Sequence, residues 1–249
     1  MRPSFEREEI DYKQGIKRGL YWLVIGISRS NRYFRLLIDI AALYYYKNFR
    51  RNKYIVFRGR RYKYFYHFYN RTVASERVVE IPLAKGVLDE YEGKEILEVG
   101  NVMSHYFKLH HDVLDKYEKG RGVINQDVVN FKPESKYDLI ISVSTLEHVG
   151  YSYGEKWEPE KFSVAIKSLK KILRSGGMLF VTLPIYLNPY ISKLILKDKM
   201  PFDEEFYLKR ETFLNEWKQV NREEAIGVAG YDSYFASSNS IYIGIYKKK

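Results

Sequence analysis

Polar residues that could bind a ligand follow the first short apolar run of the central region. Ile96–Val99 predicts a buried strand, and the glycine directly after it lets the backbone turn tightly. A helix N-terminus following such a turn could hold the carboxylate of a ligand. The candidate binding residues here are Glu98, Gly100, Asn101, Ser104 and His105. We expect Glu98 to support the loop and the others to face the ligand, with simple packing as the alternative for the histidine.

Two acids follow the next two predicted strands. Asp115 lies 17 residues after Glu98, at the end of the predicted strand His111–Leu114. At that distance a carboxylate can accept both hydroxyls of a ribose, each charge-assisted bond contributing roughly 1.5–3 kcal/mol. Asp127 comes just after Gly122–Asn125 and could accept an adenine amino group, although Asn125 or Gln126 could serve instead. The pattern therefore indicates a nucleoside-like ligand.

A third group of polar residues follows the predicted strand Tyr137–Val143. Ser144 stands directly at its end and is a further candidate for ligand binding. His148 could act as a general base, because histidine titrates near neutral pH, or it could be a structural residue that closes the pocket. Glu147 could share the catalytic role, or it could be structural or face the ligand.

The sequence shows no pattern of a metal site and no residue for thiol chemistry. His110-His111 and Glu147-His148 lack the spacing and the companions of metal ligands. The sequence has 0 cysteines, which excludes disulfides, thiolate metal sites and a cysteine nucleophile. Abundant Lys, Glu, Ile and Tyr without Cys would suit a source that grows at high temperature.

The elements that must position these residues alternate between strands and helices. Pro159–Leu173 predicts an amphipathic helix ended by Gly176-Gly177, and Met178–Leu183 predicts a fifth strand. Phe206–Lys209 and Ile241–Tyr246 predict two more. Such alternation predicts an α/β fold with a doubly wound, mostly parallel sheet of seven strands. Ligands of such sheets bind at the carboxyl ends of the strands, where the residues above lie.

An N-terminal extension of helices and a hairpin precedes this core. We expect a basic aromatic arm over residues 1–53, a lead-in over 54–92 and the core over 93–249. Two apolar stretches in the arm, Leu20–Ile27 and Phe34–Leu43, predict two short helices. Tyr54–Phe57 and Tyr62–Phe68 alternate around Arg58–Arg61 and predict a hairpin. Pro82 suits the first turn of a helix that runs to about Tyr91.

The lead-in also holds polar residues that could cover the ligand. Tyr69, Asn70 and Arg71, with Glu76 and Arg77, could form a lid over it, and plain connecting structure is the alternative.

The excess of positive charge lies entirely in the first third of the chain. Residues 1–71 hold 17 Lys/Arg and 5 Asp/Glu, a net of +12, and the remaining 25 Lys/Arg and 26 Asp/Glu give −1, which together make +11. A field of one sign implies an anionic partner such as a membrane face, a nucleic acid or a phosphorylated substrate. Aromatic and basic residues beside apolar helix faces suit a membrane interface or a partner groove.

Three segments resemble class I S-adenosylmethionine-dependent methyltransferases. Ile96–Gly100 (ILEVG) is similar to their first motif, Tyr137–His148 to their fourth-strand segment, and Lys170–Pro184 to their helix–turn–fifth-strand signature. The Leu-Glu-His after the fourth strand is most similar to the methyltransferase type 11 group. The segments GNVMSHY and YNRT…ERVVEIP also resemble enzymes of polysaccharide and glycan biosynthesis. The resemblance implies a Rossmann-like methyltransferase fold, with S-adenosyl-L-methionine as the cofactor.

The first motif departs from the family pattern. The usual loop Glu-x-Gly-x-Gly-x-Gly keeps only Gly100 here, and Val102 and Met103 stand among the positions that follow. Asn101 can adopt a left-handed conformation, but these two residues cannot do so cheaply. We therefore expect the loop to follow a different path or to lie farther from the cofactor.

These observations favour methyl transfer to a small molecule, a hydroxyl of a sugar or glycan intermediate. RNA methylation on ribose or base, with the basic arm holding phosphates, is the alternative. A cyclopropane-fatty-acid-type enzyme shares Glu-His-Val-Gly, but the glycine loop and the missing cysteine argue against it. A cofactor-binding interaction protein without catalysis is a further alternative. The charged start of the chain does not resemble a signal peptide, so the expected location is cytoplasmic, with peripheral attachment to a membrane through residues 1–53.

Overall fold

The computed structural model describes residues 32–151, 154, 156–232 and 237–249. They form two compact units. One extends to Pro82 and also contains Leu208–Ser240, and the other contains Leu83–Tyr207 and Ile241–Lys249. A segment near the C-terminus thus belongs with the N-terminal part of the chain. The boundaries expected after residues 53 and 92 stay predictions.

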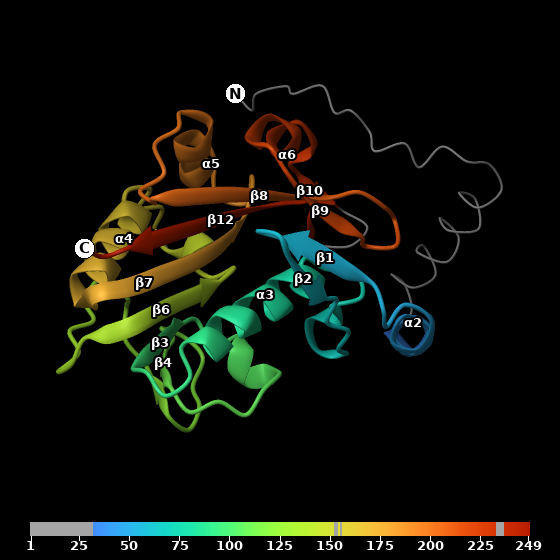
Figure 1. Ribbon diagram of the computed structural model, residues 1–249, viewed down its shortest axis with the longest axis horizontal. Helices are drawn as coiled ribbons and strands as arrows, with labels where there is room; N and C mark the ends of the chain where they lie inside the picture. Colours follow the sequence, from blue (N-terminus) through green and yellow to red (C-terminus); the bar gives the residue numbers. More distant parts are fainter. Residues whose placement is uncertain (1–31, 152–153, 155, 233–236) are drawn as a thin grey trace. The chain divides into compact units, whose positions relative to one another are not determined.

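The largest sheet has eight strands in the order β5-β4-β3-β6-β7-β12-β8-β9 (Figure 1). Neighbours from β5 to β7 are parallel, and β12 is antiparallel to β7. The predicted α/β fold with a doubly wound, mostly parallel sheet is confirmed, with eight strands where seven were expected. The strand bounds are β3 Ile96–Val99, β4 Asp112–Leu114, β5 Val123–Ile124, β6 Tyr137–Val143, β7 Leu173–Pro184, β8 Glu204–Arg210, β9 Trp217–Val220 and β12 Ser240–Lys247.

The core of the second unit lies on both sides of β6. All residues of this strand except Asp138 are buried, as the nearly continuous apolar run predicts for a central parallel strand. Helix α4 (Lys161–Ile172) buries Phe162, Ala165, Ile166 and Leu169, which recur at helical spacing on one face. The helix predicted over Pro159–Leu173 is therefore confirmed within two residues at its start.

The pair Gly176-Gly177 does not separate a helix from a strand, as the sequence suggested. Strand β7 begins at Leu173, which pairs with Tyr137, while Met178 pairs with Leu139. The four residues between Leu173 and Met178 thus bulge opposite a single residue of β6. Gly176 takes a φ of 78°, and its N–H donates to the Lys248 carbonyl at 2.7 Å, which holds the bulge to the chain end.

The N-terminal unit begins with helix α2 (Arg32–Phe49) and a hairpin of β1 (Tyr54–Phe57) and β2 (Arg60–Lys63). The hairpin is confirmed, but its turn is only Arg58-Gly59, both with positive φ. This is the two-residue turn that matches the twist of paired strands. The predicted helix over Phe34–Leu43 lies within α2, and the one over Leu20–Ile27 lies outside the described residues. Over the described part of the chain, no helix is long and apolar enough to cross a membrane.

Pro82 lies inside helix α3 (Arg77–Glu90) and not in its first turn, which corrects the sequence-based expectation. Proline has no N–H to donate, so the carbonyl of Val78, four residues earlier, loses its helical partner. The backbone N–H of Phe65 donates to this carbonyl at 3.0 Å instead. A long-range contact that local propensity cannot indicate therefore lets the helix begin before the proline.

Several short elements were not predicted. They are η1 Tyr69–Arg71, η2 Met103–His105, η3 Leu146–His148, α5 Pro189–Leu196, α6 Arg222–Val228, β10 Tyr231–Asp232 and β11 Ser237–Ser238, besides β9. Most have seven residues or fewer, too short for hydrophobic periodicity to distinguish them from loops.

Asn215, in the turn between β8 and β9, holds the N-terminal unit together. Its buried Nδ2 donates to the carbonyls of Thr72, Val73 and Ser75 at 3.2, 3.2 and 2.9 Å. Its Oδ1 accepts from Trp217 Nε1 at 2.7 Å, and its φ is 56°. One side chain thus joins two segments about 140 residues apart.

We expect Asn215→Ala to lower the free energy of unfolding by about 2–4 kcal/mol, because buried carbonyls lose their donor and alanine is strained at this φ. Urea unfolding followed by tryptophan fluorescence measures the change. Asn48→Ala, on the exposed face of α2, is the matched control. A loss equal to that of the control would show that Asn215 does not join the two segments.

Candidate functional site

The strand order of the sheet reverses between β3 and β6, since β4 and β5 continue on one side and β7 on the other. Ligands of open α/β sheets bind beyond the carboxyl ends of the strands at such a point. The predicted site residues follow β3, β4, β5 and β6, which are neighbours in the sheet. They therefore gather at one edge of the second unit.

Glu98, the third residue of β3, is fully buried. One of its carboxylate oxygens, Oε1, accepts from the backbone N–H groups of Val102 and Met103 at 2.8 and 2.6 Å. The carboxylate thereby fixes the turn that follows the strand. These contacts are consistent with the expected role of Glu98 in supporting the loop. Direct contact with a ligand would need an exposed carboxylate oxygen, and Glu98 has none.

His111, which the sequence analysis considered only for metals, completes this arrangement. Its Nε2 lies 2.9 Å from Glu98 Oε2, and the two side chains are 3% and 0% exposed. The imidazole thus contacts Oε2, while the loop amides bond to the other carboxylate oxygen, Oε1. The position of His111 just before β4, which pairs with β3, was the only signal that could have indicated this contact.

Gly100 is the single glycine that the loop retains, and the structure shows why it is needed. Its φ is 88°, and a Cβ built on it would lie 2.2 Å from Thr145 Oγ1. The turn after β3 therefore passes directly against the residue that follows Ser144. A side chain at position 100 would separate the ends of β3 and β6.

The rest of the loop contains no further glycine, and its expected departure from the family's loop stays a prediction. Val102 has φ −106° and ψ −52°, and Met103–His105 form a short 3-10 helix. Asn101 Nδ2 donates to Glu118 Oε1 at 2.5 Å, and Ser104 Oγ donates to Asn101 Oδ1. His105 Nε2 lies 2.9 Å from the same Glu118 oxygen. Side chains thus close this loop, and Glu118 belongs to the candidate site although sequence reasoning missed it.

Asp115 directly follows β4 and is half-buried. Its Oδ1 accepts from the N–H groups of Tyr117 and Glu118 at 2.8 and 2.7 Å, and its Oδ2 accepts from Asn101 N at 3.2 Å. The carboxylate therefore stands between the loop after β3 and the turn after β4. Its predicted role toward a ribose stays a prediction.

Asp127, after β5, lies between two lysines. Its Oδ2 is 3.1 Å from Lys161 Nζ and 3.5 Å from Lys116 Nζ, and its Oδ1 accepts from Val129 N at 3.2 Å. Burial alone would raise the pKa of this carboxyl, but the Val129 amide and the Lys161 ammonium outweigh it and hold the pKa below its usual value. Asp127 is thus a charged acceptor, and its contact with an adenine stays a prediction.

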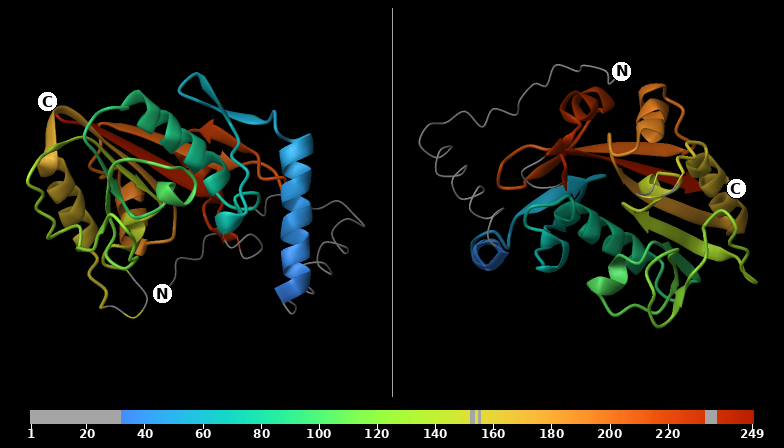
Figure 2. Two further views of the ribbon diagram at one scale, coloured as in Figure 1. Left: turned by 90° about the horizontal axis from the view of Figure 1, so that it is seen from below. Right: turned by 180° about the vertical axis from the view of Figure 1, so that it is seen from behind.

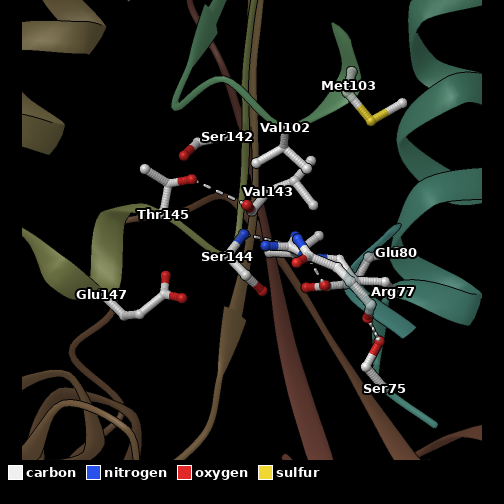
Figure 3. Close-up of polar contacts among 12 residues, drawn as sticks. Ser75, Arg77, Glu80, Val102, Met103, Ser142, Val143, Ser144, Thr145 and Glu147 are labelled. Carbon is white, nitrogen blue, oxygen red and sulfur yellow. Dashed lines mark hydrogen bonds and ion pairs between the residues drawn. The ribbon is translucent and has the colours of Figure 1, made fainter. Parts of the chain in front are cut away.

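Ser144 ends β6 in a strained conformation. Its φ is 40°, and its N–H donates to both Thr182 O and Thr182 Oγ1 at 3.0 and 3.2 Å. Figure 3 shows Ser144 next to Val143 and Thr145, with Glu147 on the short helix that follows. A non-glycine residue in this region costs of order 1–3 kcal/mol and is common at functional sites. The strain turns the chain sharply into η3, which carries Glu147 and His148.

The two candidate catalytic residues differ in their surroundings. Glu147 is 1% exposed, while the side chain of His148 is 56% exposed, with Nε2 3.8 Å from Glu147 Oε1. Asn188, buried at the start of α5, donates to the Glu147 carbonyl at 2.8 Å and thereby holds η3 in place. A solvent-facing imidazole beside a buried carboxylate can take up a proton, and its catalytic role stays a prediction. Over the residues that the structure covers, no group of His, Asp and Glu could hold a metal ion.

This chain is similar to several solved structures of S-adenosylmethionine-dependent methyltransferases. NodS from Bradyrhizobium japonicum, an N-methyltransferase crystallised with S-adenosylhomocysteine, is 14% identical over 67% of this chain and 85% of NodS, with a TM-score of 0.41. A methyltransferase from Thermotoga maritima, described as a possible histamine N-methyltransferase, is 17% identical over 68% of this chain and 87% of its own, with a TM-score of 0.40.

The sugar N-methyltransferase KedS8 from Streptoalloteichus is 11% identical over 51% of this chain and 53% of its own, with a TM-score of 0.32. No protein-family profile matches the chain, and no curated protein sequence is similar to it. The strand order and pairing of its own sheet define the fold independently of these likenesses.

The buried pair Glu98–His111 leads to a stability prediction. In His111→Phe, one oxygen of a buried carboxylate loses its donor, so the free energy of unfolding should fall by about 1–3 kcal/mol. His111→Gln retains a donor and should lose clearly less. Urea unfolding of both variants measures the difference, and equal losses would mean that packing alone explains the histidine.

The Asp127 cluster leads to a titration prediction. Asp127 has a lower pKa in the folded protein than in the unfolded chain. Its carboxylate therefore stabilises the fold fully at pH values above the unfolded pKa. This stabilisation is lost as the pH falls through the folded pKa. Lys161→Gln should therefore raise the pKa of Asp127 towards 3.8, its ordinary value, and weaken this acid dependence. Carbon-13 NMR of the carboxyl measures the shift, and Lys167→Gln on the exposed side of α4 should leave it unchanged. An unchanged pKa in Lys161→Gln would contradict the assignment.

Proposed function

We propose that the protein transfers a methyl group from S-adenosylmethionine to a small-molecule acceptor, a hydroxyl of a sugar or glycan intermediate. The observation that carries the proposal is the convergence of Asp127, Asp115, the loop held by Glu98 and the strained Ser144 at the ends of four adjacent strands. These residues belong to different parts of the sequence, and one ligand at the switch point would meet all of them.

The residues at this edge fit a nucleoside. An ionised carboxylate has about four lone-pair sites, and Asp115 accepts only three backbone hydrogen bonds, so it can still bind a ribose hydroxyl. Because these backbone donors fix its orientation, little ordering is needed when the ligand binds. Gly100, with no room for a Cβ, brings the backbone of the loop close to the end of β6.

Alignment is the main contribution that this site can make. S-adenosylmethionine, when bound, supplies a methyl group that its sulfonium already activates. Asp115 and the loop would fix the position of the cofactor, and holding donor and acceptor in line can lower the barrier by roughly 7–11 kcal/mol. Glu98 and His111 act only through the loop and are positioning residues.

A sugar hydroxyl is a poor nucleophile, so this acceptor needs a base. His148 is exposed and lies 3.8 Å from the Glu147 carboxylate, which would stabilise the imidazolium formed when it takes the hydroxyl proton. This arrangement supports an oxygen acceptor, because a neutral amine would not require the base.

The cofactor site is tested by S-adenosylmethionine binding to the full chain. We expect micromolar affinity in calorimetry and a loss of tenfold or more in Asp115→Ala, since the ribose loses a charged acceptor. Asp89→Ala, an exposed acid of α3, is the control. Absence of binding by the wild type would show that the altered glycine loop has lost the cofactor.

The base is tested by His148→Ala. With a sugar hydroxyl as acceptor, turnover should fall roughly 10²- to 10⁴-fold while the affinity for S-adenosylmethionine stays unchanged. Product formation is measured with a panel of nucleotide sugars, with RNA as the competing acceptor. Unchanged turnover in His148→Ala, or activity on RNA alone, would contradict the proposed acceptor chemistry.

A further inference from the structure

Helix α2 exposes an apolar face. Its positions 33, 37, 40 and 44 recur at helical spacing and carry Tyr33, Leu37, Ile40 and Tyr44, which are 78%, 63%, 51% and 66% exposed. Leu36, on the same side of the helix, is 43% exposed. An ordinary surface helix buries such a stripe and exposes its polar residues.

The opposite face of α2 is anchored to its own unit, so the outward orientation of the apolar stripe is fixed. Asp39 is buried and pairs with Arg71 at 2.8 Å. The ring of Tyr46 lies 5.1 Å from that of Tyr66. At the end of the helix, Arg50 is buried and bonds to Glu216 at 2.5 Å. Polar and aromatic contacts thus hold the side of the helix that faces the protein.

Positive charge lies near the C-terminal end of this stripe. Lys47, within the exposed face near the helix end, and Arg51 just beyond it are exposed. Lys53 is also exposed, and its Nζ pairs with Glu216 Oε1 at 2.9 Å. Asp39 is the sole acid between residues 32 and 75, and its charge is neutralised by Arg71. This part of the surface therefore carries exposed cations without exposed carboxylates from the same stretch of sequence.

The hairpin of β1 and β2 follows α2 in the same unit (Figure 2). It adds a second surface of the same composition. Tyr54 pairs with Lys63 and Val56 with Arg61, and all four side chains are exposed. The guanidinium of Arg61 lies 4.8 Å from the centre of the Tyr54 ring. Aromatic, aliphatic and basic side chains are thus mixed on both exposed surfaces.

We propose that α2 lies in the interface of an anionic membrane, with its apolar face among the lipid acyl chains and the cations near its C-terminal end at the lipid phosphates. An exposed apolar stripe with aromatic residues and flanking Lys/Arg is the chemistry that lipid interfaces bind. Nucleic-acid phosphates would use the cations but leave the aliphatic side chains in water. A second copy of the chain would bring two cationic surfaces together.

The inference is independent of the methyl-transfer proposal, because no residue of the switch-point site takes part in it. Membrane attachment would nevertheless suit the proposed enzyme, since an enzyme held at a membrane meets lipid-linked acceptors. The two proposals can therefore fail separately.

The test is flotation of the full chain with vesicles of phosphatidylcholine alone or mixed with phosphatidylglycerol. We expect binding to the mixed vesicles only, and at least a tenfold loss in the double variant Leu37→Ser, Ile40→Ser. Lys47→Gln with Arg51→Gln should weaken binding about fivefold for each charge, and added salt should have the same effect. Val164→Ser, at an apolar residue of α4 that is 48% exposed, should leave binding unchanged.

Circular dichroism of each variant checks that α2 is retained. Full vesicle binding by the Leu37→Ser, Ile40→Ser variant would overturn the proposal, as would equal binding to neutral vesicles. Absence of vesicle binding together with tight RNA binding would assign the cations to nucleic acid. A dimer that the double variant converts to a monomer, without vesicle binding, would assign the apolar face to a second copy.

Discussion

The buried carboxylate of Glu98 is the constraint on which the site depends. A charge placed at the end of a core strand is unfavourable unless every oxygen has a donor, and here the two loop amides and His111 supply them. The same contacts fix the turn beyond β3. The loop therefore needs no glycine series for its shape, and residues as large as Val102 and Met103 can occupy it, buried against the core.

Two further acids, Glu118 and Asp115 of the turn after β4, also hold the loop after β3. Glu118 receives the side chain of Asn101 and lies beside His105, and Asp115 receives the Asn101 amide. Side-chain acceptors of the turn after β4 thus hold the loop after β3. Hydrogen bonds from the backbone and the side chain of Asn101 thus join the two turns that border the candidate site.

The parts of the fold that the sequence predicted are those governed by local pattern. The buried run Tyr137–Val143 and the helix before β7 were predicted because periodicity and length define them. The roles of Pro82 and Gly176-Gly177 were predicted wrongly because distant residues bond to the backbone there. The Phe65 amide bonds to the carbonyl that Pro82 leaves without a helical donor, and the Lys248 carbonyl accepts from Gly176. No local sequence pattern indicates such contacts. In the candidate site, the acids after each strand were predicted from sheet topology, whereas His111 and Glu118 became visible only through contacts between separate turns.

The hydrogen bond from Phe65 to Val78 has a consequence for the order in which the N-terminal unit forms. The first turn of α3 lacks one internal bond at Pro82 and obtains it from a residue 13 positions before Val78. That turn is therefore complete only when the chain leaving the hairpin has docked on it. In native-state hydrogen exchange, the Phe65 amide should open together with this helical turn and not with the hairpin strands that precede it in the sequence.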